Sequence, residues 1–383
     1  MQAVIGCVEH MSIWGRSSGM LRRVSARPVL LAVVICTWLA ANSVSGSESF
    51  GNVTIIAGFS PGGGDEGGGP GGRNAASRLQ PQPGYDQTAR LFARHIGAFL
   101  PGNPSTAVRH MPGAGSIKAA AFIANGAARD GSILGVVSAA ALLAPLLGTG
   151  DGSYALDSFS FIGGRNADEY VCAAAGVSGV ESFEDWPAGE MAFGVSAPGR
   201  RPYVHAHLLK QLAAGPIRIV SGYRDTNEMM LALRRGEVAG ICGLSFETLR
   251  AGLQGLLASG KVQPLMRLSP PWLEKLRAVP RAQDVARRRG MTPEFINALD
   301  FMALEGAIAW TLVAPALVSP ERMALLRTAF EAMQRDRGYL REAARRNLDI
   351  ETVGAARIEA AVADILKTPA DTLAIVKNLN AAP

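Results

Sequence analysis

The sequence predicts an α/β protein of two lobes, each a mostly parallel sheet flanked by helices, with two strands crossing between the lobes. Three observations support this prediction. Short apolar runs alternate with stretches of helical periodicity, the alternation restarts near Phe161, and 383 residues are enough to build two cores. The composition, 48% hydrophobic and 18% charged, is that of an ordinary globular protein.

The first 46 residues (1–46) are expected to form a signal peptide that directs export to the periplasm. An arginine-rich stretch at 22–27 precedes an apolar stretch at 28–41, which is too short to span a bilayer comfortably. Small residues at 42–47 then permit cleavage. Met20 offers a second start, and a membrane anchor is the alternative role for the apolar stretch.

The first lobe is assigned to residues 47–164. Its expected elements are strands at 53–59, 107–110 and 132–138 and helices at 86–99 and 117–125. In the first of these helices, apolar side chains recur on one side and arginines face away, which is the pattern of a half-buried helix. A Pro-Gly-Ala-Gly turn at 112–115 precedes the second helix, and Ser116 is placed to cap it.

The second lobe is assigned to residues 165–265, and residues 266–383 are expected to return to the first lobe and to end in helices. The sequence predicts strands at 161–164, 170–174, 191–195, 217–220, 238–242, 262–267 and 307–314, and helices at 203–212, 227–235, 248–259, 320–333, 338–347 and 357–366. Gly236 is expected to end the helix that precedes it. An architecture of this kind places a ligand in the cleft between the lobes.

A glycine-rich stretch after the first strand matches a nucleotide-binding pattern by spacing alone. Residues 62–67 fit G-x-G-x-x-G, but more glycines follow, and helical periodicity begins only near Asp86. A dinucleotide loop leads directly into the helix that holds the pyrophosphate, and a Walker loop needs Gly-Lys-Ser/Thr. We therefore expect no nucleotide site. We interpret residues 65–84 as a flexible insertion, because this composition has little to bury.

Without that insertion, several motifs stand in a recognisable order. The pattern F-x-P-G-G-G-x-D-x-x-A-R is matched at Phe59, Pro61, Gly62, Gly63, Gly64, Asp86, Ala89 and Arg90. P-G-A-G follows at 112–115, D-G at 130–131, G-Y-x-x-x-N-E at 222–228 and G-E-V at 236–238. Together these motifs resemble the substrate-binding receptors of tripartite tricarboxylate transporters, the Bug-type proteins. The resemblance covers residues 52–380.

The resemblance implies a non-catalytic, exported receptor that binds a small carboxylate and presents it to the membrane subunits of a transporter. It implies a monomer without cofactor, metal or nucleic acid. An orphan or sensory receptor is the alternative, and a hydrolase or nucleotide-binding enzyme is the third hypothesis. The implied ligand-binding residues, mostly in loops that offer backbone N–H groups, are Ser60, Pro61, Gly62, Gly63, Gly64, Tyr85, Asp86, Gly113, Ala114, Gly115, Ser138, Ala139, Ser196, Ala197, Gly199, Tyr203, Tyr223, Asn227, Gly243 and Ser245.

Some of these residues can have a structural role instead of binding the ligand. Asp86 is expected to cap a helix rather than to touch the ligand, and Tyr203 and Tyr223 can pack in the core. The glycines can serve as tight turns only. A separate expectation concerns Ala239, Ile241 and Leu244, which stand where relatives carry polar or larger side chains, and which favour a smaller or less polar acid.

Other chemistry has little support in the sequence. Ser196 lies in Gly-Val-Ser-Ala-Pro, which lacks the second glycine of a nucleophile elbow. His205 and His207 are two residues apart in an expected helix, so they point away from each other and suit no metal. Basic residues do not alternate with aromatic ones, as a nucleic-acid surface would require. Cys172 and Cys242 are either a disulfide or two buried thiols.

Overall fold

The computed structural model describes residues 49–61, 84–150, 153–176, 183, 186, 189–197 and 200–380. All of them belong to one unit, Glu48–Pro383. The predicted signal peptide lies outside the described residues, and so does the predicted insertion except for its last residue, Gly84. Within the described part of the chain, no helix is both long and apolar enough to cross a bilayer.

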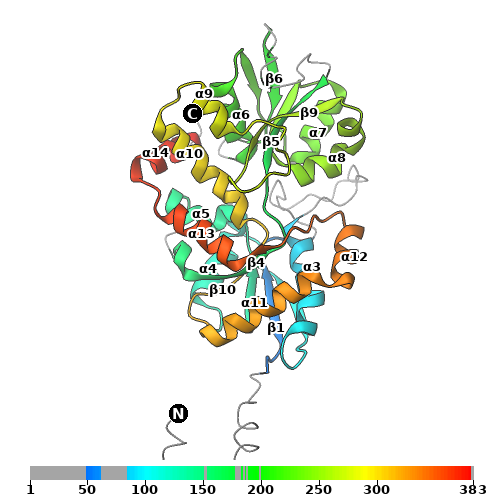
Figure 1. The fold of residues 1–383 in the computed structure, drawn as a ribbon, viewed down its shortest axis with the longest axis vertical. Helices are drawn as coiled ribbons and strands as arrows, with labels where there is room; N and C mark the ends of the chain where they lie inside the picture. Colours follow the sequence, from blue (N-terminus) through cyan, green and yellow to red (C-terminus); the bar gives the residue numbers. More distant parts are fainter. Residues whose placement is uncertain are drawn as a thin grey trace, which may run out of the picture. The chain divides into compact units, whose positions relative to one another are not determined.

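The first sheet has the strand order β11-β4-β10-β3-β1-β2 (Figure 1). Its strands are β1 (Val53–Ala57), β2 (Thr106–His110), β3 (Ile133–Val136), β4 (Phe159–Gly164), β10 (Thr311–Pro315) and β11 (Val353–Gly354). Successive strand residues point to opposite faces, so Ile55 packs in one core and Ile56 in another. Buried side chains on both faces explain why β1 reads as a continuous apolar run.

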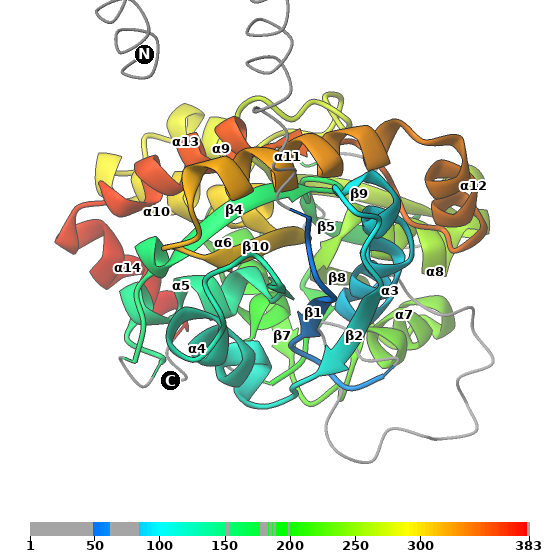
Figure 2. The ribbon, with the colours of Figure 1, turned by 90° about the horizontal axis from the view of Figure 1, so that it is seen from below.

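Helices cover both faces of this sheet. One face packs against α3 (Tyr85–Ile96), α11 (Pro320–Arg335) and α12 (Arg337–Arg345), and the other against α4 (Ile117–Asn125), α5 (Ala139–Leu147) and α13 (Ala355–Leu366). Figure 2 shows α11 on one side of β4 and β10 and α4 on the other. The sheet is therefore the middle layer of a three-layer lobe.

The second sheet has the strand order β7-β6-β8-β5-β9. Its strands are β5 (Tyr170–Ala175), β6 (Met191–Gly194), β7 (Ile217–Val220), β8 (Gly240–Ser245) and β9 (Val262–Leu268), and its helices are α6 (Arg201–Leu212), α7 (Thr226–Arg235) and α8 (Phe246–Ala258). Gly236 ends α7 with a left-handed conformation (φ 73°), as the sequence predicts. A disulfide joins Cys172 of β5 to Cys242 of β8, which decides between the two roles left open for these cysteines.

The predicted two-lobed α/β architecture is confirmed, with one difference in the sheets. Strands joined by a helical crossover are parallel: β1 with β2 and β3, and β6 with β7 and β8. The pairs β10–β3, β10–β4, β11–β4, β5–β8 and β5–β9 are antiparallel. Each sheet is thus mixed rather than mostly parallel, because the strands next to the crossings run against their neighbours.

The chain passes between the lobes by two different kinds of connection. The first, at residues 165–169 between β4 and β5, contains neither helix nor strand. The return from β9 instead runs through α9 (Ala282–Arg288), α10 (Pro293–Leu304) and the 3-10 turn η5 (Glu305–Ile308), so the predicted second crossing strand is replaced by helices. The connections touch: Asp168 N–H donates to the Gly306 carbonyl at 3.0 Å, and a Cβ on Gly306 would lie 2.3 Å from the Asp168 carbonyl oxygen.

Every predicted strand and helix has a counterpart in the structure, with ends shifted by a few residues. Four helices were not predicted from the sequence: α5, α9, α10 and α14 (Ala370–Asn380). The reason is clearest in α5, whose sequence AAALLAPLL is apolar all round and so has no helical periodicity to detect. These missed helices matter, because three of them line the site described below.

Candidate functional site

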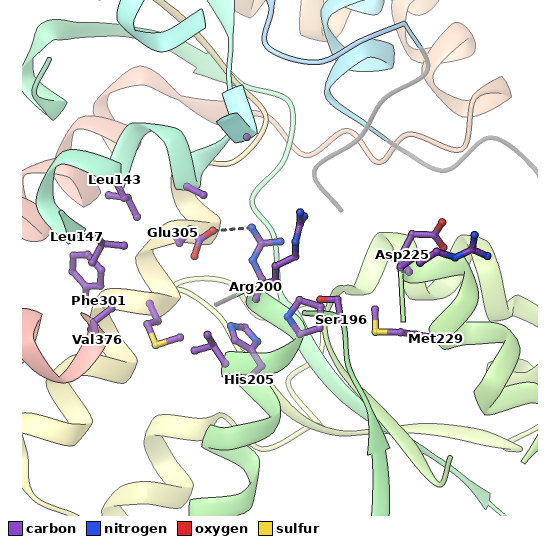
Figure 3. A pocket seen from close by; sticks show the side chains of 18 residues that line it. Leu143, Leu147, Ser196, Arg200, His205, Asp225, Met229, Phe301, Glu305 and Val376 are labelled. Atoms are coloured by element: carbon purple, nitrogen blue, oxygen red, sulfur yellow. Dashed lines mark hydrogen bonds and ion pairs between the residues drawn. The ribbon is translucent and has the colours of Figure 1, made fainter. Parts of the chain in front are cut away.

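A cavity of about 230 Å³ lies between the lobes (Figure 3). The first lobe contributes Gly115, Ala140, Leu143 and Leu147, and the second contributes Ser196, Arg200, Arg201, Pro202, Val204, His205, Arg224, Asp225, Thr226 and Met229. The return segment and the C-terminal helix contribute Phe301, Met302, Glu305 and Val376. Because the walls come from both lobes, the space between them changes with any hinge movement.

One side of the cavity is formed by the N-terminal end of α6. Arg200 is the N-cap residue and makes no side-chain cap, and Pro202 occupies the first turn. The first N–H groups of a helix have no partner within the helix, and together they carry a partial positive charge that attracts anions. Gly243 permits this arrangement: its φ is +75°, and a Cβ there would lie 2.6 Å from Pro202 Cα.

Three arginines line the cavity, and they differ in their partners. Arg201 forms an ion pair with Glu305 at 2.7 Å, and its guanidinium lies 4.1 Å from the centre of the Tyr170 ring. Arg224 pairs with Glu228 at 2.9 Å and is largely exposed. The Arg200 side chain makes no ion pair or hydrogen bond with any residue of the described part of the chain. Its charge is therefore available to a ligand.

The opposite wall of the cavity is apolar. It consists of Leu143 and Leu147 from α5, Phe301 and Met302 from α10, and Val376 from α14. The sequence analysis expected an apolar end at Ile241 and Leu244, but these side chains pack in the core between β8, α7 and α8 and do not line the cavity. The cavity thus has an apolar wall, but residues other than Ile241 and Leu244 form it.

No family model matches the sequence, and no curated protein matches it. Among solved structures, the chain is similar to a TctC solute-binding protein from Polaromonas, with 16% identity, a TM-score of 0.60, and coverage of 86% of this chain and 97% of that one. The fold is that of periplasmic solute-binding proteins. BugD, a periplasmic binding protein, has 15% identity and a TM-score of 0.52, covering 86% of this chain and 97% of its own. An R. palustris protein solved with adipate has 17% identity and a TM-score of 0.50, covering 85% and 97%.

This solute-binding-protein fold brings only some of the predicted ligand residues to the cavity. Gly115 and Ser196 line it, and Ala139 is next to the lining residue Ala140. The Ser196 hydroxyl is buried and has no hydrogen-bond partner in the described structure, so it is a further polar group available to a ligand. Gly62, Gly63, Gly64 and Gly199 lie outside the described residues.

The Pro-Gly-Ala-Gly turn reaches the cavity in a strained conformation. Gly113, Ala114, Gly115 and Ser116 all have positive φ, and for Ala114 (46°) and Ser116 (84°) this costs about 1–2 kcal/mol each. Ser138 holds the turn: its hydroxyl donates to the Gly115 carbonyl at 2.9 Å, and its N–H donates to Ser116 Oγ at 3.3 Å. Ser116 occupies the expected N-cap position of α4, but its side chain makes no capping hydrogen bond.

Several other predicted residues have structural contacts instead of lining the cavity. Tyr85 stacks on Phe59 and Trp310, and its hydroxyl accepts from Ala139 N–H at 3.4 Å. Asp86 does not cap α3, whose N-cap is Gly84; it pairs with Arg90 at 2.8 Å and His110 at 2.6 Å. The remaining predicted residues outside the cavity lining are Ser60, Pro61, Gly113, Ala114, Ser138, Ala197, Tyr203, Tyr223, Asn227, Gly243 and Ser245.

The two predicted tyrosines of the second lobe pack against protein. Tyr203 is buried in the core, with its ring centre 4.4 Å from that of His207. Tyr223 lies against Gly194, where an added Cβ would be 3.0 Å from its ring. Asn227 has a buried Oδ1 with no hydrogen-bond partner in the part of the chain that the structure describes. The packing alternative for both tyrosines thus has direct support.

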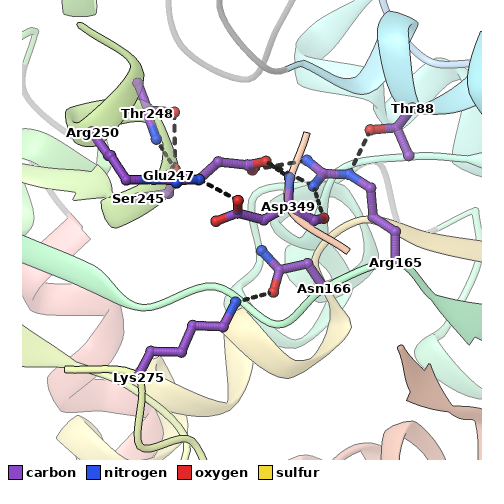
Figure 4. A network of polar contacts seen from close by, with 9 residues as sticks. All are labelled: Thr88, Arg165, Asn166, Ser245, Glu247, Thr248, Arg250, Lys275 and Asp349. Carbon is purple, nitrogen blue, oxygen red and sulfur yellow. Dashed lines mark hydrogen bonds and ion pairs between the residues drawn. The ribbon is translucent and has the colours of Figure 1, made fainter. Parts of the chain in front are cut away.

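Ser245 belongs to a buried polar network that joins the lobes (Figure 4). Its hydroxyl caps α8 by accepting from Thr248 N–H at 3.2 Å, and α8 then presents Glu247 to Arg165. Both Arg165–Glu247 contacts measure 3.0 Å, and Arg165 also donates to Thr88 Oγ1 at 3.0 Å and to the Asp349 carbonyl at 2.8 Å. One buried guanidinium therefore connects α3 of the first lobe with α8 of the second.

Sequence reasoning missed the arginines of the cavity, although the sequence carries a signal for them. Arg200 and Arg201 stand at the start of α6, where a positive charge is disfavoured by the helix dipole. An anion bound at that position would compensate the unfavourable positive charge of the basic pair. The glycine-rich motifs of the sequence indicate backbone donors alone, and the side-chain cations add to them.

Proposed function

We propose that this protein is an exported receptor of the tripartite tricarboxylate transporter family that captures a small carboxylate in the interlobe cavity and presents it to membrane subunits. One observation carries the proposal: Arg200, without a partner in the described structure, and the N-terminal end of α6 face an apolar wall across a cavity of about 230 Å³. A carboxylate accepts charge-assisted hydrogen bonds from such donors, while its carbon chain packs on the apolar wall.

The size of the cavity supports a small ligand. Pockets for drug-sized molecules have volumes of roughly 300–1,000 Å³, and this cavity is below that range. The fold and the ordered motifs of the sequence support the receptor role, and export is supported by the apolar N-terminal stretch. An orphan or sensory receptor would bind the same ligand, so the two are separated by whether genes for transporter subunits lie nearby.

An enzymatic role has weaker support. Ser196 and His205 line the same cavity, but burial, with a smaller effect of the Arg201 charge, lowers the pKa of His205 to about 3. A histidine with this pKa is neutral at physiological pH and is a poor general base. The carboxylate of Glu305, which also lines the cavity, pairs with Arg201.

The test is thermal unfolding of the chain from Ser47 onward with a panel of mono-, di- and tricarboxylates. Ligand at a hundredfold excess over its dissociation constant should stabilise the fold by about 2.7 kcal/mol. Arg200→Gln should remove the shift, whereas Arg218→Gln, which changes an exposed arginine paired with Glu190, should keep it. A variant lacking residues 65–84 should be compared in parallel. No shift with any acid, in either length of chain, would contradict the proposal.

A further inference from the structure

We propose that the cavity selects a monocarboxylate with an apolar chain, and that Glu305 is the residue that excludes a second carboxylate from the ligand. This inference rests on the proposed function, because it names the class of carboxylate bound at the same site.

The charge of the lining matches a single carboxylate. Among the described residues that line the cavity, Arg200, Arg201 and Arg224 face Asp225 and Glu305, which leaves a net charge of +1 with His205 neutral. The local pairing adds which cation is left: the Asp225 carboxylate caps α7 by accepting from Glu228 N–H at 3.0 Å, and it forms no ion pair with any of the three arginines in the described structure. Arg201 is matched by Glu305 and Arg224 by Glu228, so Arg200 remains as the cation without an acidic partner in the described structure.

Glu305 lies on the apolar side of the cavity. It directly follows α10, with helical backbone angles (φ −53°, ψ −40°), so it is four residues after Phe301 on a continuing helical turn. Residues four apart on a helix share a face, so Glu305 and Phe301 extend from the same side of this helical segment. Figure 3 shows both side chains on the same wall, with Glu305 extended towards the arginines.

This position places a negative charge next to the path of the ligand's chain. A carboxylate bound at Arg200 and the start of α6 directs its carbon chain towards Leu143, Phe301 and Met302. A second carboxylate at the far end of that chain would leave water for apolar side chains and would approach Glu305. Both effects are unfavourable, because buried charges need partners and like charges repel.

The Arg201–Glu305 pair is shielded from solvent, with side-chain exposures of 12% and 16%. Screening by water and salt is weaker at such a site than at the surface. Glu305 also occupies Arg201, which would otherwise be a second cation able to bind a second carboxylate. Replacing Glu305 by an uncharged side chain should thus remove a repulsion and release an attraction at the same time.

The experiment compares two five-carbon acids, pentanoate and glutarate, which differ by one terminal carboxylate. Isothermal titration calorimetry at neutral pH should show the native protein binding pentanoate at least about tenfold more tightly than glutarate. Glu305→Gln should strengthen glutarate binding by about tenfold and leave pentanoate binding within about threefold. Glu190→Gln is the matched control, because it frees Arg218 in an exposed pair outside the cavity, and it should change neither affinity.

The outcomes separate this inference from the proposed function. Failure of every carboxylate to bind the native protein would refute the proposed function and with it the inference. Binding of glutarate as tightly as pentanoate by the native protein would overturn the inference alone, and this measurement needs no variant to fold. A folded Glu305→Gln variant with unchanged preference would overturn the role of Glu305. Circular dichroism of each variant shows whether it is folded.

Discussion

At the scale of single residues, Arg165 is a side chain on which the junction of the lobes depends. It is fully buried, forms two contacts of 3.0 Å with Glu247, and lies 4.4 Å from the centre of the Trp310 ring. A buried ion pair adds little stability compared with apolar residues, but removing one partner leaves an uncompensated charge. The junction therefore depends on both members being present.

Arg165→Met should lower the free energy of unfolding by about 3–5 kcal/mol, because Glu247 would lose its cation in a buried site. Urea denaturation followed by circular dichroism measures this change. Arg218→Met is the control: its pair with Glu190 is more than half exposed, and its loss should cost less than about 1 kcal/mol. Equal effects of the two substitutions would show that the Arg165 network is not buried as described.

Asp168, in the first connection between the lobes, should make stability depend on pH. Burial, helped by the charge of Glu247, raises its pKa from 3.8 to about 7. Between these values the folded protein holds a proton that the unfolded chain has lost, so Asp168 makes stability fall as pH rises, by up to about 1.4 kcal/mol per pH unit. His205 acts in the opposite direction between its folded pKa of about 3 and its ordinary value of 6.5.

Asp168→Asn should remove the fall in stability with rising pH that Asp168 causes. The free energy of unfolding of the variant, relative to that of the native protein, should increase as pH rises from about 4 to 7. Above pH 7 the difference should stay constant. Urea denaturation at one-unit pH steps provides the measurement. A difference that does not change with pH would mean that Asp168 titrates at its ordinary value in the folded protein.

Two of the ligand residues predicted from backbone motifs, Gly115 and Ser196, line the cavity. The turn that contains Gly115 and the loop that contains Ser196 both reach the cavity. Glu305 and Val376 were not found, because they come from segments far apart in the sequence that only the tertiary fold brings together. Asp86 was given a capping role because the sequence does not show His110 beside it.

At the scale of elements, the contact between β8 and the start of α6 sets one side of the cavity. The two meet at Gly243, which lacks the Cβ that would collide with the Pro202 backbone. This close approach fixes where the free N–H groups of α6 point.

Gly243→Ala should displace the start of α6 and weaken carboxylate binding by at least about tenfold, since small misplacements of binding groups are costly. Gly236→Ala is a matched control: Gly236 has nearly the same φ (73° against 75°), but a Cβ there meets nothing within 4 Å. It should lower stability by about 1–2 kcal/mol and leave binding unchanged. Calorimetric titration of both variants decides, and equal loss of binding would contradict the role of the contact.

Elements with one exposed face were predictable, because their apolar residues recur with the period of a helix or strand. Helices that pack on several sides were not. α10 and α14 contact each other, and α5 has no polar face at all, so none shows a periodic pattern against a polar background. The cavity takes its apolar wall from these three helices, which is why the fold could be predicted better than the site.

At the scale of the whole molecule, the second lobe carries a covalent bond within its sheet. The Cys172–Cys242 disulfide joins residues 70 apart in the sequence and is buried between β5 and β8. Replacing both cysteines by alanine should lower the free energy of unfolding by about 2–4 kcal/mol, mainly by releasing the unfolded chain. Reductant should destabilise the native protein and leave the double variant unaffected, as thermal unfolding can show; sensitivity of both would contradict this account.

The sequence predicted the two lobes because each lobe repeats the same alternation of strand and helix, with β5 opening the second. It did not predict that the return connection would be helical, or that the sheets would be mixed. Both follow from the packing of distant segments at the junction, where Gly306 meets Asp168.

The contribution of α14 to the cavity has a consequence for biosynthesis. Val376 of α14 forms part of the same wall as Leu143, although more than 230 residues separate them in the sequence. A nascent polypeptide therefore lacks one side of the pocket until α14 has been synthesised. A late frameshift that removes α14 would leave both sheets intact and delete one side of the pocket.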